Sequence, residues 1–418
     1  MANTNLKKQN ASLPNQTKIS EIKPYIQNAK KHTKKQVAQV AASIKEFGFN
    51  QPLVLDKDNF IIVGHGRYEA AKLLGLKEVP AIVVDLTPEQ SNAYRLADNK
   101  LNESEWDMKL VIEELKGLSM PMLELTGFDK DLIIEESELD DVIPENVPAR
   151  SKLGDLYELG QHRILCGDST QEEAVSALCG GKKADIVVTD PPYNTGMDGK
   201  EMKKTKQGDH VRLDHFFNDN LNEADFSNLI TKSLKNSFDN SKGACAFYVF
   251  IDWRRGGQIK SLIETFMPVK NVIVWDKQVH GLGSDYKSTY ELCVVGKKGK
   301  PDIQNRYGLD YQDIWRLQRT MGRNKDHATA KPVDLLTKPI THASKTDDIC
   351  LDLFLGSGST LIACEKTGRI CYGMELSEKY IDVIVQRYVD YVPDAVVKLN
   401  GNIISWPDQQ KENKQIKK

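Results

Sequence analysis

Two short loops of this 418-residue chain carry residue types that could do chemistry. The first is Asp190-Pro191-Pro192-Tyr193-Asn194, which follows the apolar run ADIVVT. Two consecutive prolines continue neither a strand nor a helix, so they hold the carbonyls between a carboxylate and an aromatic ring in fixed directions. Such a loop could accept both N–H bonds of an exocyclic amino group and leave the nitrogen lone pair free to attack. Tyr193 could stack on a base flipped out of a duplex.

The second loop, DLFLGSGST, begins at Asp352 and opens the helical run LIACEKTG. Gly356 and Gly358 allow the backbone to approach a ligand closely and to turn into the helix. Glu375 ends the next apolar run, where a carboxylate can accept hydrogen bonds from both hydroxyls of a ribose. The pattern predicts a nucleoside site, with a structural turn as the alternative. The loop lacks a third glycine and GxxxxGK[ST] is absent, so triphosphate binding is not expected.

The elements that must position these loops are short apolar strands that alternate with helical patterns. The strand candidates are ADIVVTD, GACAFYVF, NVIVW, ELCVVG, DICLDLF and RICYGMEL. Such alternation predicts an α/β domain with a mostly parallel sheet, which binds ligands at the carboxyl ends of its strands.

Together, DPPY, FLGSG and their order resemble a β-class DNA amino-methyltransferase of the N6-adenine/N4-cytosine family. In that circularly permuted group the catalytic loop precedes the cofactor loop, and a target-recognition segment lies between them. The resemblance covers residues 150–405. It extends to ILCGDS, to WDKQVHGLG and to KPVDLL, while Leu353 and Ser359 depart from the family's usual DPF and GSGTT.

The resemblance implies a Rossmann-like domain that uses S-adenosylmethionine to methylate the N6 amino group of adenine at specific sites in double-stranded DNA, as in restriction–modification. It implies target recognition at about residues 276–330, allows a homodimer and implies no metal. The implied catalytic residues are Asp190, Pro191, Pro192 and Tyr193. The implied cofactor-binding residues are Asp168, Lys331, Asp352, Phe354, Gly356, Ser357, Gly358, Ser359 and Glu375.

Other functions stay open at this point. The leading Asp190 and the asparagine after DPPY favour adenine N6, with cytosine N4 as the alternative. A non-catalytic DNA-binding or partition-type protein is a second alternative, against which the intact motif residues argue. Methylation of RNA or of a protein glutamine amide is a third, although protein-directed relatives usually carry NPPY and place the cofactor loop first. Covalent C5 chemistry is not expected, because no Pro-Cys dipeptide occurs.

Residues 18–128 resemble the ParB-like nuclease/sulfiredoxin fold, a small α+β domain. The likeness rests on a predicted helix, then QPLVL, then the segment GHGRYEA at residues 64–70. In relatives this turn binds nucleotide phosphates. No cysteine precedes Cys166, which excludes sulfiredoxin chemistry. A DNA- or partner-binding accessory role is predicted; a vestigial structural role and nucleotide binding or nuclease activity are the alternatives. His65 is expected to be packed or solvated.

Composition limits the class and the location of the protein. A hydrophobic content of 40% and a charged content of 28% are those of a globular protein without a membrane span. The first residues lack a secretory signal, and the seven scattered cysteines read as buried thiols, so a cytoplasmic location is predicted. The net charge is −2, but residues 270–331 hold twelve Lys and Arg against seven Asp and Glu.

Three further segments complete the predicted organisation of the chain. Residues 1–17 are predicted to be disordered and residues 406–418 to form a polar tail. Residues 129–149 are predicted to be an acidic linker, because residues 129–145 hold eight acidic side chains and one lysine.

Overall fold

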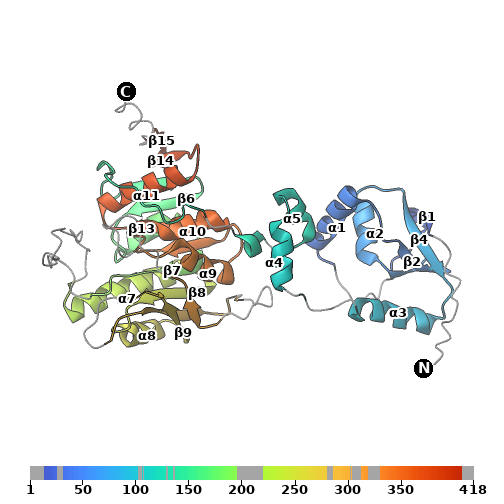
Figure 1. Ribbon diagram of the computed structural model, residues 1–418, viewed down its shortest axis with the longest axis horizontal. Helices are drawn as coiled ribbons and strands as arrows, with labels where there is room; N and C mark the ends of the chain where they lie inside the picture. The colour runs from blue at the N-terminus through green and yellow to red at the C-terminus, as the bar shows by residue number, and fades with distance from the viewer. Residues whose placement is uncertain are drawn as a thin grey trace. The chain divides into compact units, whose positions relative to one another are not determined.

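The computed structural model describes residues 14–25, 32–101, 106, 108–128, 130–134, 137–194, 220–279, 286–301, 303, 312–318 and 330–406. The chain divides into two compact units, Met1–Ile133 and Ile134–Lys418, which are coloured from blue to teal and from green to red in Figure 1. Each unit is built around its own sheet.

The sheet of the first unit has the strand order β1-β4-β2-β3. Its strands are β1 (Asn15–Lys18), β2 (Leu53–Asp56), β3 (Ile61–Val63) and β4 (Glu78–Val84). Strand β2 runs parallel to β4, and the two other pairings are antiparallel. Strands β2 and β3 lie within QPLVLDKDNFIIVGHGR, and Asn59 in the turn between them has φ 65°.

Strand β1 corrects one expectation. Residues 1–17 were predicted to be disordered, and this is wrong for residues 15–17, because β1 pairs with Glu78–Ala81 of β4. Its four residues, NQTK, are mostly exposed, so backbone hydrogen bonds rather than an apolar face hold it to the sheet. Residues 1–13 lie outside the described residues.

Helices and two 3₁₀ turns complete the first unit. They are η1 (Ile19–Glu21), α1 (Lys34–Phe47), α2 (His65–Leu73), α3 (Pro88–Leu101), α4 (Met108–Lys116), α5 (Met120–Thr126) and η2 (Lys130–Ile133). Helix α1 begins at a capping box between Thr33 and Gln36 and ends before Gly48. Strands β2, β3 and β4 and helix α2 bury a small core of aliphatic side chains and Tyr68.

The second unit contains a sheet with the order β11-β9-β10-β8-β7-β12-β13-β6-β5-β14-β15. The strands are β5 (Leu156–Leu159), β6 (His162–Cys166), β7 (Ala184–Thr189), β8 (Ser241–Ile251), β9 (Val269–Asp276), β10 (Tyr290–Lys298), β11 (Ile314–Arg316), β12 (Ile349–Asp352), β13 (Ile370–Glu375), β14 (Val397–Leu399) and β15 (Asn402–Ile404). The run β8-β7-β12-β13-β6 is parallel. Strand β10 is antiparallel to both of its neighbours. All six predicted strands are confirmed.

Helices cover both faces of this sheet (Figure 1). The helices α6 (Glu172–Cys179), α7 (Glu223–Asp239) and α8 (Gly256–Glu264) pack on one face. The helices α9 (Val333–Ala343), α10 (Ser359–Thr367) and α11 (Glu378–Tyr391) pack on the other. Two apolar clusters, one on each face, therefore sandwich the sheet, which is the doubly wound α/β arrangement.

The ends of the second unit are more ordered than the sequence suggests. Part of the predicted acidic linker packs in this unit: Asp140 is 5% exposed and forms an ion pair with Lys366 of α10. Trp406, assigned to the polar tail, donates to Gln386 of α11 at 3.0 Å. Both segments find partners among buried side chains of α10 and α11, Lys366 and Gln386, which a local sequence pattern does not reveal.

The seven cysteines are unpaired and buried in the second unit, as predicted. Within the parts of the chain that the structure describes, no helix is long and apolar enough to cross a membrane.

Candidate functional site

Four of the predicted acidic residues gather at one edge of the second sheet. The strands β7, β12, β13 and β6 are parallel neighbours, so their carboxyl ends meet there. Asp190 follows β7, Asp352 ends β12, Glu375 ends β13 and Asp168 follows β6. The Gly167 N–H donates to the Glu375 carbonyl at 2.9 Å, which places the Asp168 turn beside the end of β13. The structure thus brings both loops to the predicted edge.

At the catalytic loop, Asp190 has partners for both carboxylate oxygens. Oδ1 accepts from the Tyr193 hydroxyl at 2.8 Å, and Oδ2 accepts from the Lys331 ammonium at 2.6 Å. The Tyr193 hydroxyl also lies 2.9 Å from Oε2 of Glu291. The Asp190 side chain remains 30% exposed, whereas those of Lys331 and Glu291 are only 6% and 11% exposed. The Asp190 side chain is therefore the most accessible of the three.

Lys331 was predicted to bind the cofactor, and in the structure its ammonium contacts Asp190 and Tyr193 of the DPPY loop. It lies 3.1 Å from Glu291 Oε2, and Lys277 approaches Glu291 Oε1 at 3.3 Å. Glu291 and Lys277 were not predicted as site residues. For Lys277 the available signal was the family resemblance of WDKQVHGLG, which contains it. Glu291 lies near the start of β10, and no motif of the resemblance includes it.

The charges in this cluster reinforce one another. Burial by itself would raise the pKa of Glu291, but Lys331 and Lys277 outweigh it and lower that pKa to about 2. Burial would lower the pKa of Lys331, but Asp190 and Glu291 raise it above its usual value. Burial raises the pKa of Asp190, and the attraction of Lys331 offsets only part of that effect. The cluster therefore contains a firmly charged Lys331–Glu291 pair beside a more basic Asp190 carboxylate.

Asp352 connects the two loops. It is 2% exposed, and its carboxylate accepts from Thr189 at 2.7 Å and from Thr360 at 2.6 Å. Thr189 immediately precedes Asp190, whereas Thr360 lies in the first turn of α10. Burial raises the pKa of Asp352 to about 6. Asp352 thus acts in this structure as a buried bridge between the catalytic loop and the glycine loop.

The glycine loop has the geometry of a ligand cradle. The Gly356 N–H donates to Glu375 at 2.9 Å, and the backbone of Gly356 and Gly358 is left-handed at φ 55° and 87°. A Cβ added at Gly358 would lie 3.3 Å from Ile384, whereas one added at Gly356 would enter open space. Burial raises the pKa of Glu375 to about 7. Open backbone beside a partly buried carboxylate fits the ribose of a nucleoside.

The remaining predicted cofactor residues surround this cradle. Phe354 packs, partly buried, against the cluster that contains α6, α7 and α8. The Ser357 carbonyl and the Ser359 hydroxyl accept from Arg387 at 2.9 and 3.3 Å. The partly exposed Asp168 accepts from the Thr170 N–H at 2.8 Å. Asp168, Phe354 and Ser357 are partly exposed, whereas Ser359 is buried.

Asn194, the last residue of the first loop, is hydrogen-bonded to Leu221. Asn194, at φ 53°, exchanges hydrogen bonds with the backbone of Leu221 at 2.7 and 2.9 Å. Residues 195–219, and the parts of the predicted target-recognition segment at 280–285, 302, 304–311 and 319–329, lie outside the described residues. Strands β10 and β11, also within 276–330, belong to the central sheet.

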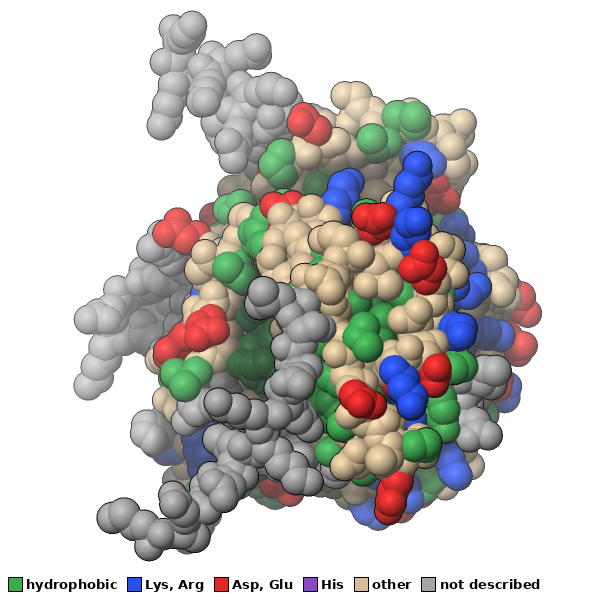
Figure 2. All heavy atoms as spheres, turned by 90° about the vertical axis from the view of Figure 1, so that its right-hand side faces the viewer, with side chains coloured by type: hydrophobic (Ala, Val, Ile, Leu, Met, Phe, Trp, Pro, Cys, Tyr) green, Lys and Arg blue, Asp and Glu red, His purple; other side chains and the backbone are tan. Residues whose placement is uncertain are grey.

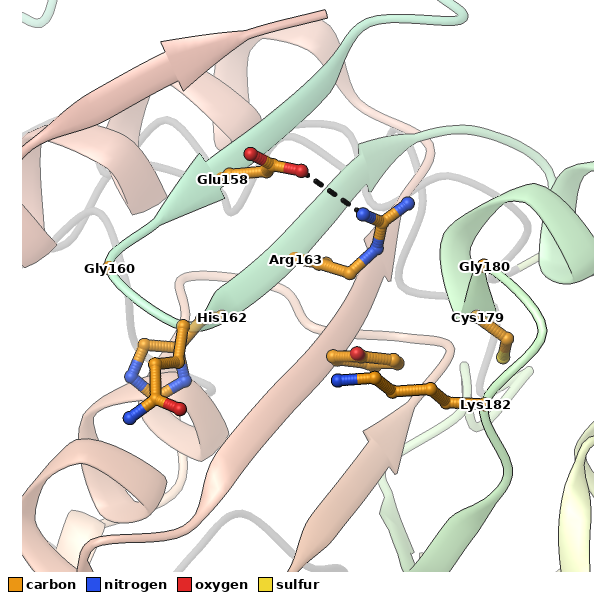
Figure 3. A pocket seen from close by; sticks show the side chains of 9 residues that line it. Glu158, Gly160, His162, Arg163, Cys179, Gly180 and Lys182 are labelled. Carbon is orange, nitrogen blue, oxygen red and sulfur yellow. Dashed lines mark hydrogen bonds and ion pairs between the residues drawn. The ribbon is translucent and has the colours of Figure 1, made fainter. Parts of the chain in front are cut away.

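A pocket of about 240 Å³ lies at the opposite edge of the sheet (Figure 3). It is lined by His162 at the start of β6 and by Arg163, whereas the site acids follow the ends of their strands. Arg163 is paired with Glu158 and donates to the Leu178 carbonyl of α6 at 2.7 Å. Its guanidinium therefore caps the carbonyl groups at the C-terminus of α6. The pocket is separate from the two loops.

In the first unit, the GHGR turn is a packed helix start. Gly64 has φ 104°, and a Cβ there would lie 2.6 Å from Leu53. His65 accepts from the Tyr25 N–H at 3.3 Å, and burial lowers its pKa to about 4. Arg67 donates to the side chain of Gln51 at 2.7 Å. His65 is thus packed, as expected, and neutral at pH 7. On the face drawn in Figure 2, the Lys and Arg side chains of the described residues are interspersed with Asp and Glu side chains.

The doubly wound sheet, with a glycine loop after one strand and DPPY after its neighbour, defines the class: a Rossmann-like methyltransferase domain. In agreement, the DNA methylase family of N6/N4 methyltransferases matches residues 184–386, and the ParB N-terminal domain family matches residues 2–100. Residues 184–386 thus match the DNA methylase family, and the chain belongs, through its first unit, to the ParB-like family.

Individual relatives match one unit each. The ParB-like nuclease domain-containing protein YnaK of Escherichia coli (strain K12) is 47% identical over 73 residues, which are 17% of this chain and 84% of YnaK. The type II methyltransferase M.HinfI of Haemophilus influenzae is 26% identical over 236 residues, which are 50% of this chain and 64% of M.HinfI. The crystal structure of the M1.HpyAVI–SAM complex covers 54% of this chain and 97% of its own, at 20% identity and a TM-score of 0.39. This chain thus spans just under two thirds of M.HinfI.

Proposed function

We propose that this protein is a site-specific DNA methyltransferase that transfers a methyl group from S-adenosylmethionine to the N6 amino group of adenine in double-stranded DNA. The observation that carries the proposal is the DPPY loop, whose partly exposed Asp190 carboxylate is joined through Asp352 to the glycine loop. A type II methyltransferase among the relatives supports a restriction–modification setting. We place the protein in the cytoplasm, where the family resemblance allows a homodimer.

The residues around the glycine loop fit the methyl donor. Glu375 would accept from the ribose hydroxyls, Asp168 would lie near the adenine, and the backbone at Gly356 and Gly358 would approach the rest of the molecule. When bound there, S-adenosylmethionine supplies an electrophilic methyl carbon on a positively charged sulfur, which leaves as a neutral thioether.

The catalytic loop would prepare the nucleophile. Asp190 and the Pro191 carbonyl accept the two N–H bonds of the target amino group, which makes its nitrogen more pyramidal and frees the lone pair. Tyr193 stacks on the flipped base. Once methylated, the amino nitrogen would be positive, and the adjacent Asp190 carboxylate would stabilise it until the nitrogen releases a proton to solvent.

Adenine is proposed over cytosine because an aspartate leads the catalytic loop and an asparagine follows it. This is a tendency within the family, so cytosine N4 is the alternative outcome of the test. The N-terminal ParB-like unit is proposed to bind DNA or a partner as an accessory.

The proposal is tested with tritium-labelled S-adenosylmethionine and three acceptors: genomic DNA, total RNA and a protein extract. We expect label in the DNA fraction only, and none with the Asp190→Ala variant. Label confined to protein, or undiminished DNA labelling by Asp190→Ala, contradicts the proposal.

A further inference from the structure

The ammonium of Lys331 is fully committed to the catalytic cluster. Its three N–H bonds are matched by three acceptors: Asp190 Oδ2 at 2.6 Å, the Tyr193 hydroxyl at 2.7 Å and Glu291 Oε2 at 3.1 Å. The ring of Tyr193 also lies 5.1 Å from the ammonium. A buried cation with every donor in use can release one acceptor at low cost only if another remains nearby.

The Tyr193 hydroxyl has a choice of acceptors. It carries a single hydrogen, yet its oxygen lies 2.8 Å from Asp190 and 2.9 Å from Glu291. The hydroxyl can therefore donate to either carboxylate, but not to both at once. Tyr193 and Lys331 thus share the same two alternative acceptors.

This arrangement matters for the proposed reaction, on which the inference rests. The target amino group needs Asp190 as an acceptor, and it competes there with the Tyr193 hydroxyl and the Lys331 ammonium, each of which donates to one oxygen of Asp190. Glu291 is the other carboxylate within reach of those donors. Lys277 holds Glu291 Oε1 at 3.3 Å, and the Glu291 side chain is only 11% exposed, so its position is fixed.

We propose that Glu291 is a positioning residue that takes over the Tyr193 hydroxyl and the Lys331 ammonium when the target amino group binds Asp190. It keeps the catalytic carboxylate available as an acceptor, because the Tyr193 hydroxyl then donates to Glu291 and the Lys331 ammonium retains Tyr193 and Glu291 as acceptors. No covalent bond changes in this exchange; only hydrogen-bond partners do.

The charge of Glu291 gives the proposal a distinctive signature. In Glu291→Gln the amide oxygen can still accept one hydrogen bond, so the cluster stays packed. The charge of Lys331 is then balanced by Asp190 alone, and the Tyr193 hydroxyl and the Lys331 ammonium both keep Asp190 as their acceptor. The negative charge that helps to raise the pKa of Asp190 is also removed, so that pKa falls.

The experiment compares the full-length wild type, Glu291→Gln and, as a matched control, Glu158→Gln, whose carboxylate pairs with Arg163 at the opposite edge of the sheet. DNA methylation is measured from pH 5 to 9, and S-adenosylmethionine affinity is measured by calorimetry. For Glu291→Gln we expect kcat to fall by about tenfold or more, which corresponds to about 1.4 kcal/mol in the transition state. The acid limb of its pH profile should move to lower pH, and cofactor affinity should be unchanged. Glu158→Gln should match the wild type.

A second readout needs no catalysis. With tyrosine labelled by ¹³C at Cζ, the Tyr193 resonance, assigned through Tyr193→Phe, reports the acceptor of its hydroxyl. We expect this resonance to shift in Glu291→Gln and not in Glu158→Gln.

A wild-type kcat and pH profile in Glu291→Gln would overturn the proposal. A loss of kcat with an unmoved acid limb and an unshifted Tyr193 resonance would also overturn it, because it would reduce Glu291 to a structural role. Failure of the proposed function would be seen separately, as a wild type that methylates no DNA, and the resonance would then still decide the role of Glu291.

Discussion

Glu375, which is proposed to bind the ribose, has an unusually high pKa. Burial raises its pKa from 4.5 to about 7, although the N–H groups of Ser377 and Gly356 partly offset this effect. Because the folded-state pKa is raised, the stability that Glu375 contributes is fully present below pH 4.5 and is lost as the pH rises through 7. Ribose hydroxyls, in contrast, bind best to the ionised form.

Cofactor affinity should therefore rise with pH. We expect the Kd for S-adenosylmethionine to fall about tenfold per pH unit between pH 5.5 and 6.5 and to level off above the Glu375 pKa of about 7. Calorimetry across this range measures it. Glu375→Gln should bind weakly at every pH in the range; an equally steep dependence in that variant would assign the titration to another group.

At the scale of elements, the start of α10 depends on a residue without a side chain. Gly358 precedes the helix at φ 87°, where a Cβ would press on Ile384 of α11 at 3.3 Å. A left-handed backbone costs other residues about 1–2 kcal/mol. Gly358→Ala should therefore shift the glycine loop and weaken S-adenosylmethionine binding.

Gly181, at φ 79° with open space around its Cβ position, provides the matched control. Gly181→Ala carries a similar backbone strain but lies beyond α6, away from the loop. We expect it to lower thermal stability without changing cofactor affinity. Equal affinities in the two alanine variants would contradict the role of the Gly358 backbone.

Helix α9 is capped from a distance. Pro332 at its N-cap position makes no side-chain cap, and the Val333 N–H instead donates to Asp141 at 2.9 Å. Asp141 belongs to the segment predicted as a linker. Asp141→Ala should cost about 1 kcal/mol and lower Tm by about 2–4 °C, whereas Asp141→Asn keeps an acceptor and should lose less. Calorimetric Tm values that are equal in the two variants would argue against the cap.

At the scale of the whole molecule, the second unit buries every thiol of the chain. Burial raises the pKa of Cys166 to about 12 and that of Cys179 to about 11, so thiolate is scarce at neutral pH. A disulfide-forming thiol reagent should therefore label the native chain far more slowly than the denatured chain, which should yield seven thiols per molecule. Rapid labelling of the native chain would show that the unit opens readily.

The features that can be predicted from the sequence are those formed by contiguous residues. The helix and strand runs, DPPY, and the glycine loop are contiguous, and parallel strands then bring Asp168, Asp190, Asp352 and Glu375 to one edge. The Lys331 contact could not be predicted in this way, because it joins residues 141 positions apart in the chain. Glu291 similarly reaches Tyr193 across 98 positions, from an antiparallel strand inserted between parallel ones. Strand β1 was missed because polar edge strands carry no apolar alternation.

The central claim concerns the base that receives the methyl group. The most direct measurement is the nucleoside composition, by mass spectrometry, of DNA methylated by the wild type and by Asp190→Ala. The account predicts N6-methyladenine from the wild type and none from the variant. N4-methylcytosine alone would reassign the base, and the absence of any methylated nucleoside in DNA treated with cofactor-binding wild-type protein would contradict the account.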